Sequence, residues 1–405
     1  MSVRRVERKE YLDKLIAFKD KHIIKIVTGI RRCGKSTLME MFQDFLKNQG
    51  IPDNRIVSIN FEDYDFYELR NPAKLHNYIK ERLADGKMTY VFLDEIQRVD
   101  DFPVVLDSLF IRKNVDLYVT GSNAFLLSSE IATLISGRYV EISMLPLSFK
   151  EYVSSADETT GLSRKYLTYI ETSSLPYVLE LIGQPKEIRD YLDGVYNTIV
   201  VKDIANRKKI PDTMMLESVA RFVFDNIGNL MSMKKIADTM TSDGRKIDVK
   251  TIEKYISALM ESYIIYRAKR YNIKGKQYLK TLDKYYVVDI GLRYMLLGTR
   301  SSDVGHILEN IIYLELLRRG CEVYVGKVDQ LEVDFVAMEA KKITYYQVAA
   351  TVRDEKTRDR ELAPLQKIDD HYPKVILTLD EDPEADYNGI RRLNALDWLM
   401  GTSDI

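Results

Sequence analysis

The sequence has few cysteines, no excess of either charge and no long apolar run. Its 405 residues include two cysteines, Cys33 and Cys321, which lie far apart in the chain and provide no disulfide framework. Sixty Lys and Arg residues are balanced by 61 Asp and Glu residues, so no global field draws the chain toward nucleic acid or an anionic membrane. No apolar run approaches the ~20 residues that a membrane-spanning helix needs. Any nucleic-acid contact must therefore come from a local patch.

The first residues, MSVRRVERKEYLDKL, are basic but lack the apolar stretch and cleavage site of a secretion signal. Together with the low cysteine content, this predicts a cytoplasmic and reduced protein without a membrane segment. Apolar residues make up 45% of the chain and charged residues 30%, as in a globular protein with a sizeable core. A chain of this length suits two or three domains of the usual ~100–200 residues.

Short apolar runs alternate with helix-like stretches over the first 150 residues. Each run is rich in β-branched or aromatic residues, as expected for strands covered on both faces. This alternation predicts a parallel sheet with helices on both sides. The five runs are IIKIVTG from Ile23, RIVSINF from Arg55, TYVFLD from Thr89, DLYVTG from Asp116 and RYVEISM from Arg138.

A phosphate-binding motif follows the first run. The pattern G-x-x-x-x-G-K-[ST] is matched at every fixed position, between an expected strand and an expected helix. In this context the backbone N–H groups face the β-phosphate of a nucleotide, Lys35 reaches the β- and γ-phosphates, and the Ser36 hydroxyl binds Mg²⁺. The residues expected to contact ATP are Gly29, Ile30, Arg31, Arg32, Cys33, Gly34, Lys35, Ser36 and Thr37.

Two acids, Asp94 and Glu95, end the third run. The carboxyl edge of a parallel sheet is where ligands of such sheets bind, so both acids should lie beside the phosphate loop. We expect Asp94 to hold Mg²⁺ through water and Glu95 to act as the general base toward the attacking water. One further strand, from about Ile56 to Phe61, lies between the two motif-bearing strands. That order favours the additional-strand class of ATPases.

Three further positions complete the expected catalytic site. Ser122 and Asn123 end the fourth run and are candidates for a γ-phosphate sensor, or for the N-cap of a helix starting at Ala124. Arg138 precedes the fifth run, where a guanidinium would stabilise transition-state charge in its own subunit or across an interface, or would be an ordinary surface arginine. Glu62 and Asp63 end the second run, either near the site or on an edge strand.

These residues together resemble a bacterial and archaeal family of AAA-type ATPases with a carboxy-terminal domain of restriction-endonuclease-like ancestry. The resemblance covers nearly the whole chain. It implies an ATPase core joined to a DNA-associated module. The segments that carry it are Gly29 to Ser36, Asn60-Phe61-Glu62-Asp63, Leu93-Asp94-Glu95-Ile96-Gln97, Thr120-Gly121-Ser122-Asn123, Ser136-Gly137-Arg138, Asp289-Ile290-Gly291-Leu292, Gly305-His306-Ile307-Leu308-Glu309-Asn310 and Glu332-Val333-Asp334-Phe335.

The middle of the chain has the pattern of a winged helix-turn-helix. Helices are expected over 233–240 and 249–262, followed by a two-strand wing made of 264–268 and 276–279. Basic residues crowd the wing and Asp283 is the one acid beside them, which suits contacts to the phosphates of DNA. A protein-binding winged helix is the alternative. The basic residues are Arg267, Lys269, Arg270, Lys274, Lys276, Lys280 and Lys284.

The last segment places Glu309 on an expected helix, and Asp334 and Gln347 on successive expected strands. Nucleases of the restriction type have Glu, Asp and (Glu/Gln)-x-Lys at this spacing, with two acids for Mg²⁺ and an ammonium for the attacking water. Ala349 stands where the lysine belongs, so we expect a degenerate nuclease retained for binding or assembly. The alternative is a lysine from elsewhere, such as Lys341 or Lys342.

The sequence thus predicts an α/β chain with a P-loop NTPase core over 1–150, a helical linker or lid over 151–230, a winged helix-turn-helix over 231–284 and a restriction-endonuclease-like domain over 285–405. The expected function is Mg²⁺-dependent ATP hydrolysis that controls DNA binding. An ATP-regulated nuclease and a signalling or scaffold ATPase acting on protein partners remain alternatives. A homo-oligomer also remains open.

Overall fold

The structure is a computed structural model and describes residues 5–84, 86–124, 137–155, 160–279, 282–298 and 303–403. The chain divides into two compact units. The first consists of Met1–Pro146 with Glu261–Tyr263, and the second of Leu147–Met260 with Ile264–Ile405. The second unit takes in most of the three segments expected after residue 150, whose division from one another stays a proposal.

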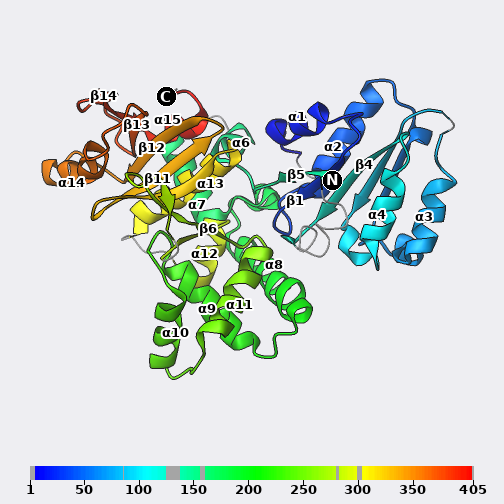
Figure 1. Ribbon diagram of the computed structural model, residues 1–405, viewed down its shortest axis with the longest axis horizontal. Helices are drawn as coiled ribbons and strands as arrows, with labels where there is room; N and C mark the ends of the chain where they lie inside the picture. The colour runs from blue at the N-terminus through cyan, green and yellow to red at the C-terminus, as the bar shows by residue number, and fades with distance from the viewer. Residues whose placement is uncertain are drawn as a thin grey trace. The chain divides into compact units, whose positions relative to one another are not determined.

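A parallel five-stranded sheet forms the centre of the first unit (Figure 1). The spatial order is β2-β3-β4-β1-β5, so β4, and not the strand from Ile56, separates the strands that carry the two motifs. The additional strand is present, but the sequence argument assigned it to the wrong segment, because β2 lies at the sheet edge. The strands are β1 (Ile24–Thr28), β2 (Ile56–Asn60), β3 (Thr89–Asp94), β4 (Val115–Gly121) and β5 (Tyr139–Ser143).

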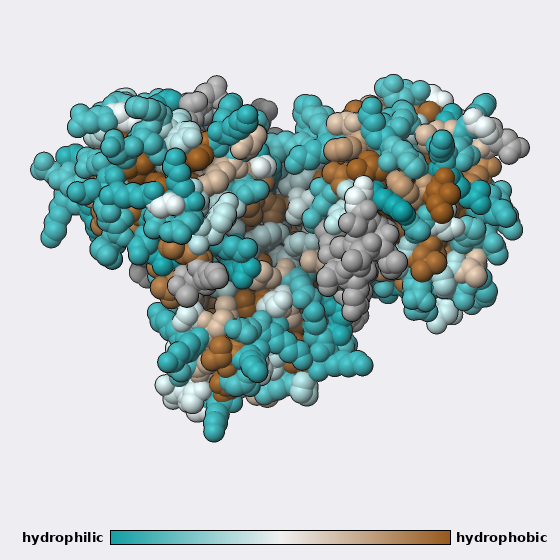
Figure 2. Space-filling model, viewed as in Figure 1, coloured by the Kyte–Doolittle hydropathy of each residue, from teal (hydrophilic) through white to brown (hydrophobic). Residues whose placement is uncertain are grey.

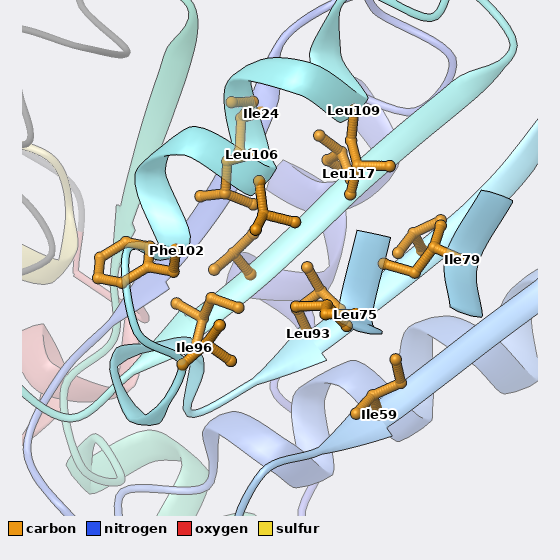
Figure 3. Close-up of a cluster of buried hydrophobic side chains, with 14 of the residues drawn as sticks. Ile24, Ile59, Leu75, Ile79, Leu93, Ile96, Phe102, Leu106, Leu109 and Leu117 are labelled. Atoms are coloured by element: carbon orange, nitrogen blue, oxygen red, sulfur yellow. The ribbon is translucent and has the colours of Figure 1, made fainter. Parts of the chain in front are cut away.

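Helices pack on both faces of this sheet. On one face, residues of α3 and α4 join side chains of the strands in one apolar cluster, which includes Leu75, Leu93 and Leu106 (Figure 3). On the other face, Phe42 of α2 contacts Phe92 and Tyr118. The helices are α1 (Lys9–Ala17), α2 (Lys35–Asn48), α3 (Pro72–Lys80) and α4 (Phe102–Phe110), with the 3₁₀ turns η1 (Asp53–Arg55), η2 (Tyr64–Arg70) and η3 (Ile96–Arg98).

Local sequence signals account for the ends of these helices. Asn71 caps α3 by accepting a hydrogen bond from the Lys74 amide, and Pro72 takes the first helical position. Gly50 follows α2 with φ of 82°, a left-handed conformation that favours glycine. Because β3 and β4 are buried along their whole length, they show the nearly continuous apolar pattern seen in the sequence.

The second unit begins with helices. They are α6 (Phe149–Ser155), α7 (Leu162–Thr172), η5 (Pro176–Leu181), α8 (Pro185–Asn197), a π-helical stretch η6 (Thr198–Asn206), α9 (Thr213–Asp225), α10 (Met233–Ser242) and α11 (Val249–Glu261). As expected from their spacing, Ile252, Tyr255, Ile256 and Leu259 form the buried stripe of α11.

A mixed eight-stranded sheet, in the order β14-β15-β13-β12-β11-β10-β7-β8, makes up the rest of the second unit, with a two-stranded ladder of β6 and β9. The α14 side of the large sheet carries an apolar cluster that includes Ile376 and Leu365. The elements are β6 (Ile265–Ala268), β7 (Arg270–Asn272), β8 (Gln277–Tyr278), β9 (Lys284–Val287), α12 (Ile290–Leu297), α13 (Val304–Arg318), β10 (Glu322–Val328), β11 (Leu331–Glu339), β12 (Lys342–Ala349), α14 (Glu355–Gln366), β13 (Lys374–Thr378), β14 (Ala385–Asp386), β15 (Ile390–Asn394) and α15 (Ala395–Met400).

The two expected helices of the winged helix-turn-helix form, but the expected wing does not. β6 pairs with β9, whereas β8 pairs with β7 in a hairpin that extends the large sheet through β10. The wing prediction failed because a strand pattern in a sequence does not specify the partner strand.

The visible face of the molecule is mostly hydrophilic, with apolar residues in separate patches (Figure 2). Among the described residues, no helix is both long enough and apolar enough to cross a membrane.

Candidate functional site

The phosphate loop adopts a conformation that requires its two glycines. Gly29 has φ of 147° and Gly34 has φ of 102°, both in the region that L side chains rarely adopt. A Cβ atom on Gly29 would also lie 2.2 Å from the Met144 carbonyl oxygen. Gly34 is the N-cap of α2, so the helix begins at Lys35 and directs its first amides toward the loop. The loop is therefore suited to bind an anion at a helix N-terminus.

Lys35 is buried at the centre of this loop. Its Nζ donates hydrogen bonds to the carbonyl oxygens of Gly29, at 3.1 Å, and Ile30, at 3.2 Å. The same Nζ lies 3.7 Å from Oε1 of Glu95. The motif lysine and the expected base therefore share one site, as the sequence predicted for the carboxyl edge of the sheet.

Asp94 lies beside the first turn of α2 and is hydrogen-bonded by two hydroxyl groups. Thr120 of β4 donates to its Oδ1, and Ser36 is its second hydroxyl partner. Burial raises the pKa of Asp94, although both hydroxyl groups act in the opposite direction. Ser36 and Asp94, the two expected Mg²⁺ ligands, are thus brought together. Their hydroxyl and carboxylate oxygens are the type of ligand that Mg²⁺ takes in proteins.

Glu95 is held from its backbone and from its side chain. It has φ of 57° and ψ of 47°, a left-handed conformation that costs a non-glycine residue roughly 1–3 kcal/mol. Its amide donates to Thr120 Oγ1 at 2.9 Å. Its Oε2 accepts from Ser122 Oγ, at 3.0 Å, and from Gln97 Nε2. One threonine hydroxyl therefore fixes Asp94 and Glu95 together.

Sequence reasoning missed Thr120 and Gln97 as site residues. Both residues lie inside motifs that carry the family resemblance, so these motifs could have pointed to them. Neither threonine nor glutamine by itself indicates catalysis. Ser122, proposed as a sensor, contacts the expected base, and Asn123 is buried next to it. Most of the helix expected from Ala124 lies outside the described residues.

A hydrogen bond connects the phosphate loop to the segment that follows β2. Glu62 accepts from Arg31, at 3.2 Å, and from Arg98, at 2.7 Å. Burial opposes ionisation of Glu62, but the two guanidinium groups outweigh it and lower the pKa of this carboxyl. Asp63 instead caps η2. Glu62 therefore supports the loop even though β2 is an edge strand.

Arg8, another residue that sequence reasoning did not select, supports the inner side of the loop. Its buried guanidinium donates to the Cys33 carbonyl at 3.0 Å, and to those of Leu145 at 2.6 Å and Pro146 at 3.3 Å. It also lies over the Tyr11 ring. This arginine joins the phosphate loop to the last residues of the first unit. The surrounding sequence contains no motif that would have revealed it.

Arg138 lies at the amino end of the strands, whereas the phosphate loop lies at their carboxyl end, so Arg138 is too far away for a role in its own subunit. β5 runs parallel to β1, with Tyr139 opposite Ile24, so Arg138 is level with the start of β1. The phosphate loop begins about six residues further along, or roughly 20 Å at the usual rise per residue of a strand. Arg138 instead pairs with Asp107 of α4. A role across a subunit interface stays a proposal.

Comparison with known proteins agrees with this geometry. An uncharacterized protein of Haemophilus influenzae is 39% identical over 404 residues, covering 99% of this chain and all of that protein. The chain belongs to the same family. Residues 21–153 match the model of an AAA domain, and residues 163–303 match a domain of unknown function (DUF8612).

Two weaker similarities cover most of the chain. An uncharacterized protein of Methanocaldococcus jannaschii is 29% identical, covering 88% of this chain and 82% of that protein. Among solved structures, the Walker-type ATPase of Pyrococcus abyssi aligns with a TM-score of 0.53 at 14% identity, covering 73% of this chain and 97% of that one. At this identity the likeness shows the fold, which is that of a P-loop ATPase.

Beyond the AAA domain, the structure brings the three expected nuclease-like residues together. Glu309 of α13, Asp334 of β11 and Gln347 of β12 line one cavity of about 660 Å³. Gln347 accepts from the Asp334 amide and donates to Glu361. Lys341 and Lys342 are exposed just before and at the start of β12, six and five residues from Gln347, or roughly 16 Å and more. Neither can be the borrowed lysine.

Most of the expected DNA-binding residues lie on β6, directly after it or on the β7–β8 hairpin. Some are already paired: Lys274 is 2.7 Å from Asp329, and Arg267 is 3.9 Å from Asp283. Lys269 and Lys276 are exposed, and Arg270 is half-buried. Lys280 lies outside the described residues. Lys284 does not join this group, because it is buried in the cavity described above.

Proposed function

We propose that the chain binds ATP with Mg²⁺ and hydrolyses it at the carboxyl edge of the first sheet. The observation that carries this proposal is the meeting of Lys35, Asp94 and Glu95 within one buried cluster. Lys35 would hold the β- and γ-phosphates, and Ser36 with Asp94 would hold Mg²⁺. The ion would neutralise phosphate charge.

The arrangement around Glu95 favours hydrolysis over simple nucleotide storage. A carboxylate at this place can orient and deprotonate the attacking water only if its position is fixed. Glu95 has that fixation from Thr120 at its amide and from Ser122 and Gln97 at its carboxylate. The left-handed backbone at Glu95 is a further sign of a functional constraint.

We further propose that the nucleotide state controls binding of DNA by the second unit. The supporting feature is the β7–β8 hairpin with the residue that precedes it, where Lys276 and Lys269 are exposed. The sequence has no acidic residue from 262 to 282. Tyr278 on this hairpin is 59% exposed, and its ring lies 5.1 Å from that of Tyr324. Cations beside exposed aromatic rings suit contacts to phosphates and bases.

The DNA proposal is tested with a Lys269→Ala/Lys276→Ala variant. Each lysine that contacts a phosphate releases counterions, so the variant should bind DNA more weakly and show a shallower dependence on salt. A Lys87→Ala/Lys113→Ala variant is the matched control, because both lysines are exposed in the first unit. Fluorescence anisotropy with labelled single-stranded and duplex DNA, at several salt concentrations, measures both quantities.

If both variants bind DNA equally well, or if DNA binding does not depend on the salt concentration, the protein-partner alternative is favoured. The same DNA added to a steady-state ATPase assay tests the coupling. Stimulation of wild type, lost in the Lys269→Ala/Lys276→Ala variant, is expected; an unchanged rate would separate ATP hydrolysis from DNA.

A further inference from the structure

Lys284 lies at the centre of the carboxylate cluster of the second unit. Its Nζ is 2.7 Å from Glu332 Oε1, 2.8 Å from Glu309 Oε1 and 3.5 Å from Asp334 Oδ1. The lysine side chain is 4% exposed. It comes from β9, whereas the carboxylates come from α13 and β11. The ammonium is therefore a central contact shared by three elements.

Each N–H donor of the ammonium has a carboxylate beside it. An ammonium has three N–H donors, and three carboxylates surround it. Most oxygens that a metal ion would use are already hydrogen-bonded by the protein. Glu309 Oε1 also accepts from Tyr286 at 2.6 Å, and Asp334 Oδ2 accepts from the Val348 amide at 2.9 Å. A divalent cation would have to compete with these donors.

The arrangement of the acidic side chains also disfavours a metal ion. Among the residues that the structure describes, no group of three or more His, Cys, Asp or Glu side chains is arranged to hold a metal ion. The carboxylates lie around the ammonium instead. The His306 imidazole also lies beside this cluster, with its Nδ1 3.7 Å from Glu309 Oε2, and that carboxylate raises its pKa.

We propose that the Lys284 ammonium takes the place of a divalent cation in this cavity. The cavity is then complete without a metal, and its carboxylates accept a divalent cation only when Lys284 is removed. The position of Lys284 would then explain an inactive nuclease-like site, and this explanation does not depend on Ala349. The lysine is present in the site, but it fills the position where the metal would bind.

The test compares Mn²⁺ binding to the full-length wild type and to a Lys284→Met variant, without nucleotide. Methionine keeps the length and apolar stem of the side chain but removes the charge. Equilibrium dialysis should find one more Mn²⁺ per chain in Lys284→Met than in wild type, and no Asp334-dependent Mn²⁺ in wild type. The added ion should disappear in Lys284→Met/Asp334→Asn.

Circular dichroism establishes that each variant is folded. A folded Lys284→Met variant that gains no Mn²⁺ would overturn the proposal. Wild type provides an independent test if the variant fails to fold: Mn²⁺ binding that is lost in Asp334→Asn, or plasmid cleavage with Mn²⁺ that is lost in the same variant, would also overturn it. These measurements do not depend on ATP hydrolysis, so they can fail separately from the proposed ATPase activity.

Discussion

Thr120 offers a sharp test of how the catalytic acids are positioned. Its fully buried hydroxyl donates to Asp94 and accepts from the Glu95 amide at 2.9 Å. Thr120→Val keeps the shape of the side chain but removes both hydrogen bonds. The amide of a strained residue then has no acceptor at this position, and a lost buried hydrogen bond of this kind costs about 1–3 kcal/mol.

The effect should appear mainly in catalysis. If about 1–3 kcal/mol is lost from the transition state, kcat for ATP hydrolysis falls by roughly 5- to 150-fold. Thr120→Ser retains the hydroxyl and should stay within about fivefold of wild type. A coupled assay of phosphate release measures kcat, and titration with a fluorescent ATP analogue measures nucleotide affinity. A folded Thr120→Val enzyme with the wild-type kcat would refute this account of Glu95.

Two further predictions concern the loop support and the second unit. Arg8→Met removes hydrogen bonds to the carbonyls of Cys33, Leu145 and Pro146, worth about 1.5–3 kcal/mol each when the donor is charged. ATP affinity should therefore fall about tenfold or more in Arg8→Met and less in Arg8→Lys, and equal affinity in all three proteins would contradict the role of Arg8. Burial and the neighbouring Glu309 raise the pKa of Asp334 to about 7, and Lys284 and Glu332 also face this side chain. The contribution of Asp334 to folding stability is therefore fully present below its ordinary pKa of 3.8 and is lost as the pH rises through 7. The unfolding temperature of wild type should thus fall relative to Asp334→Asn between pH 5 and pH 8, with exposed Asp329→Asn as the control; a constant difference would contradict the raised pKa.

The sequence predicted those features that depend on local patterns. All five strands of the first unit form within a few residues of their expected positions, because each buried strand has its own apolar pattern. The phosphate loop and the acids at the end of β3 meet because parallel strands end at a common edge.

Features that depend on long-range pairing were not predicted. The sequence did not show that β4 lies between β1 and β3, or that Arg138 pairs with Asp107 of α4. It also gave no indication that Lys284, grouped with the exposed lysines, would be buried against Glu309, which lies 25 positions further along the chain. Such contacts follow from strand order and register, which residue patterns alone do not determine.

ATP turnover by Glu95→Gln tests the central claim most directly. The amide keeps the shape of Glu95 but cannot accept a proton, and Lys35→Ala serves as the control that loses nucleotide binding. We predict that Glu95→Gln binds ATP with affinity close to wild type while its phosphate release falls at least 100-fold, and that Lys35→Ala does not bind. Hydrolysis at the wild-type rate by Glu95→Gln would contradict the assignment of Glu95 as the base.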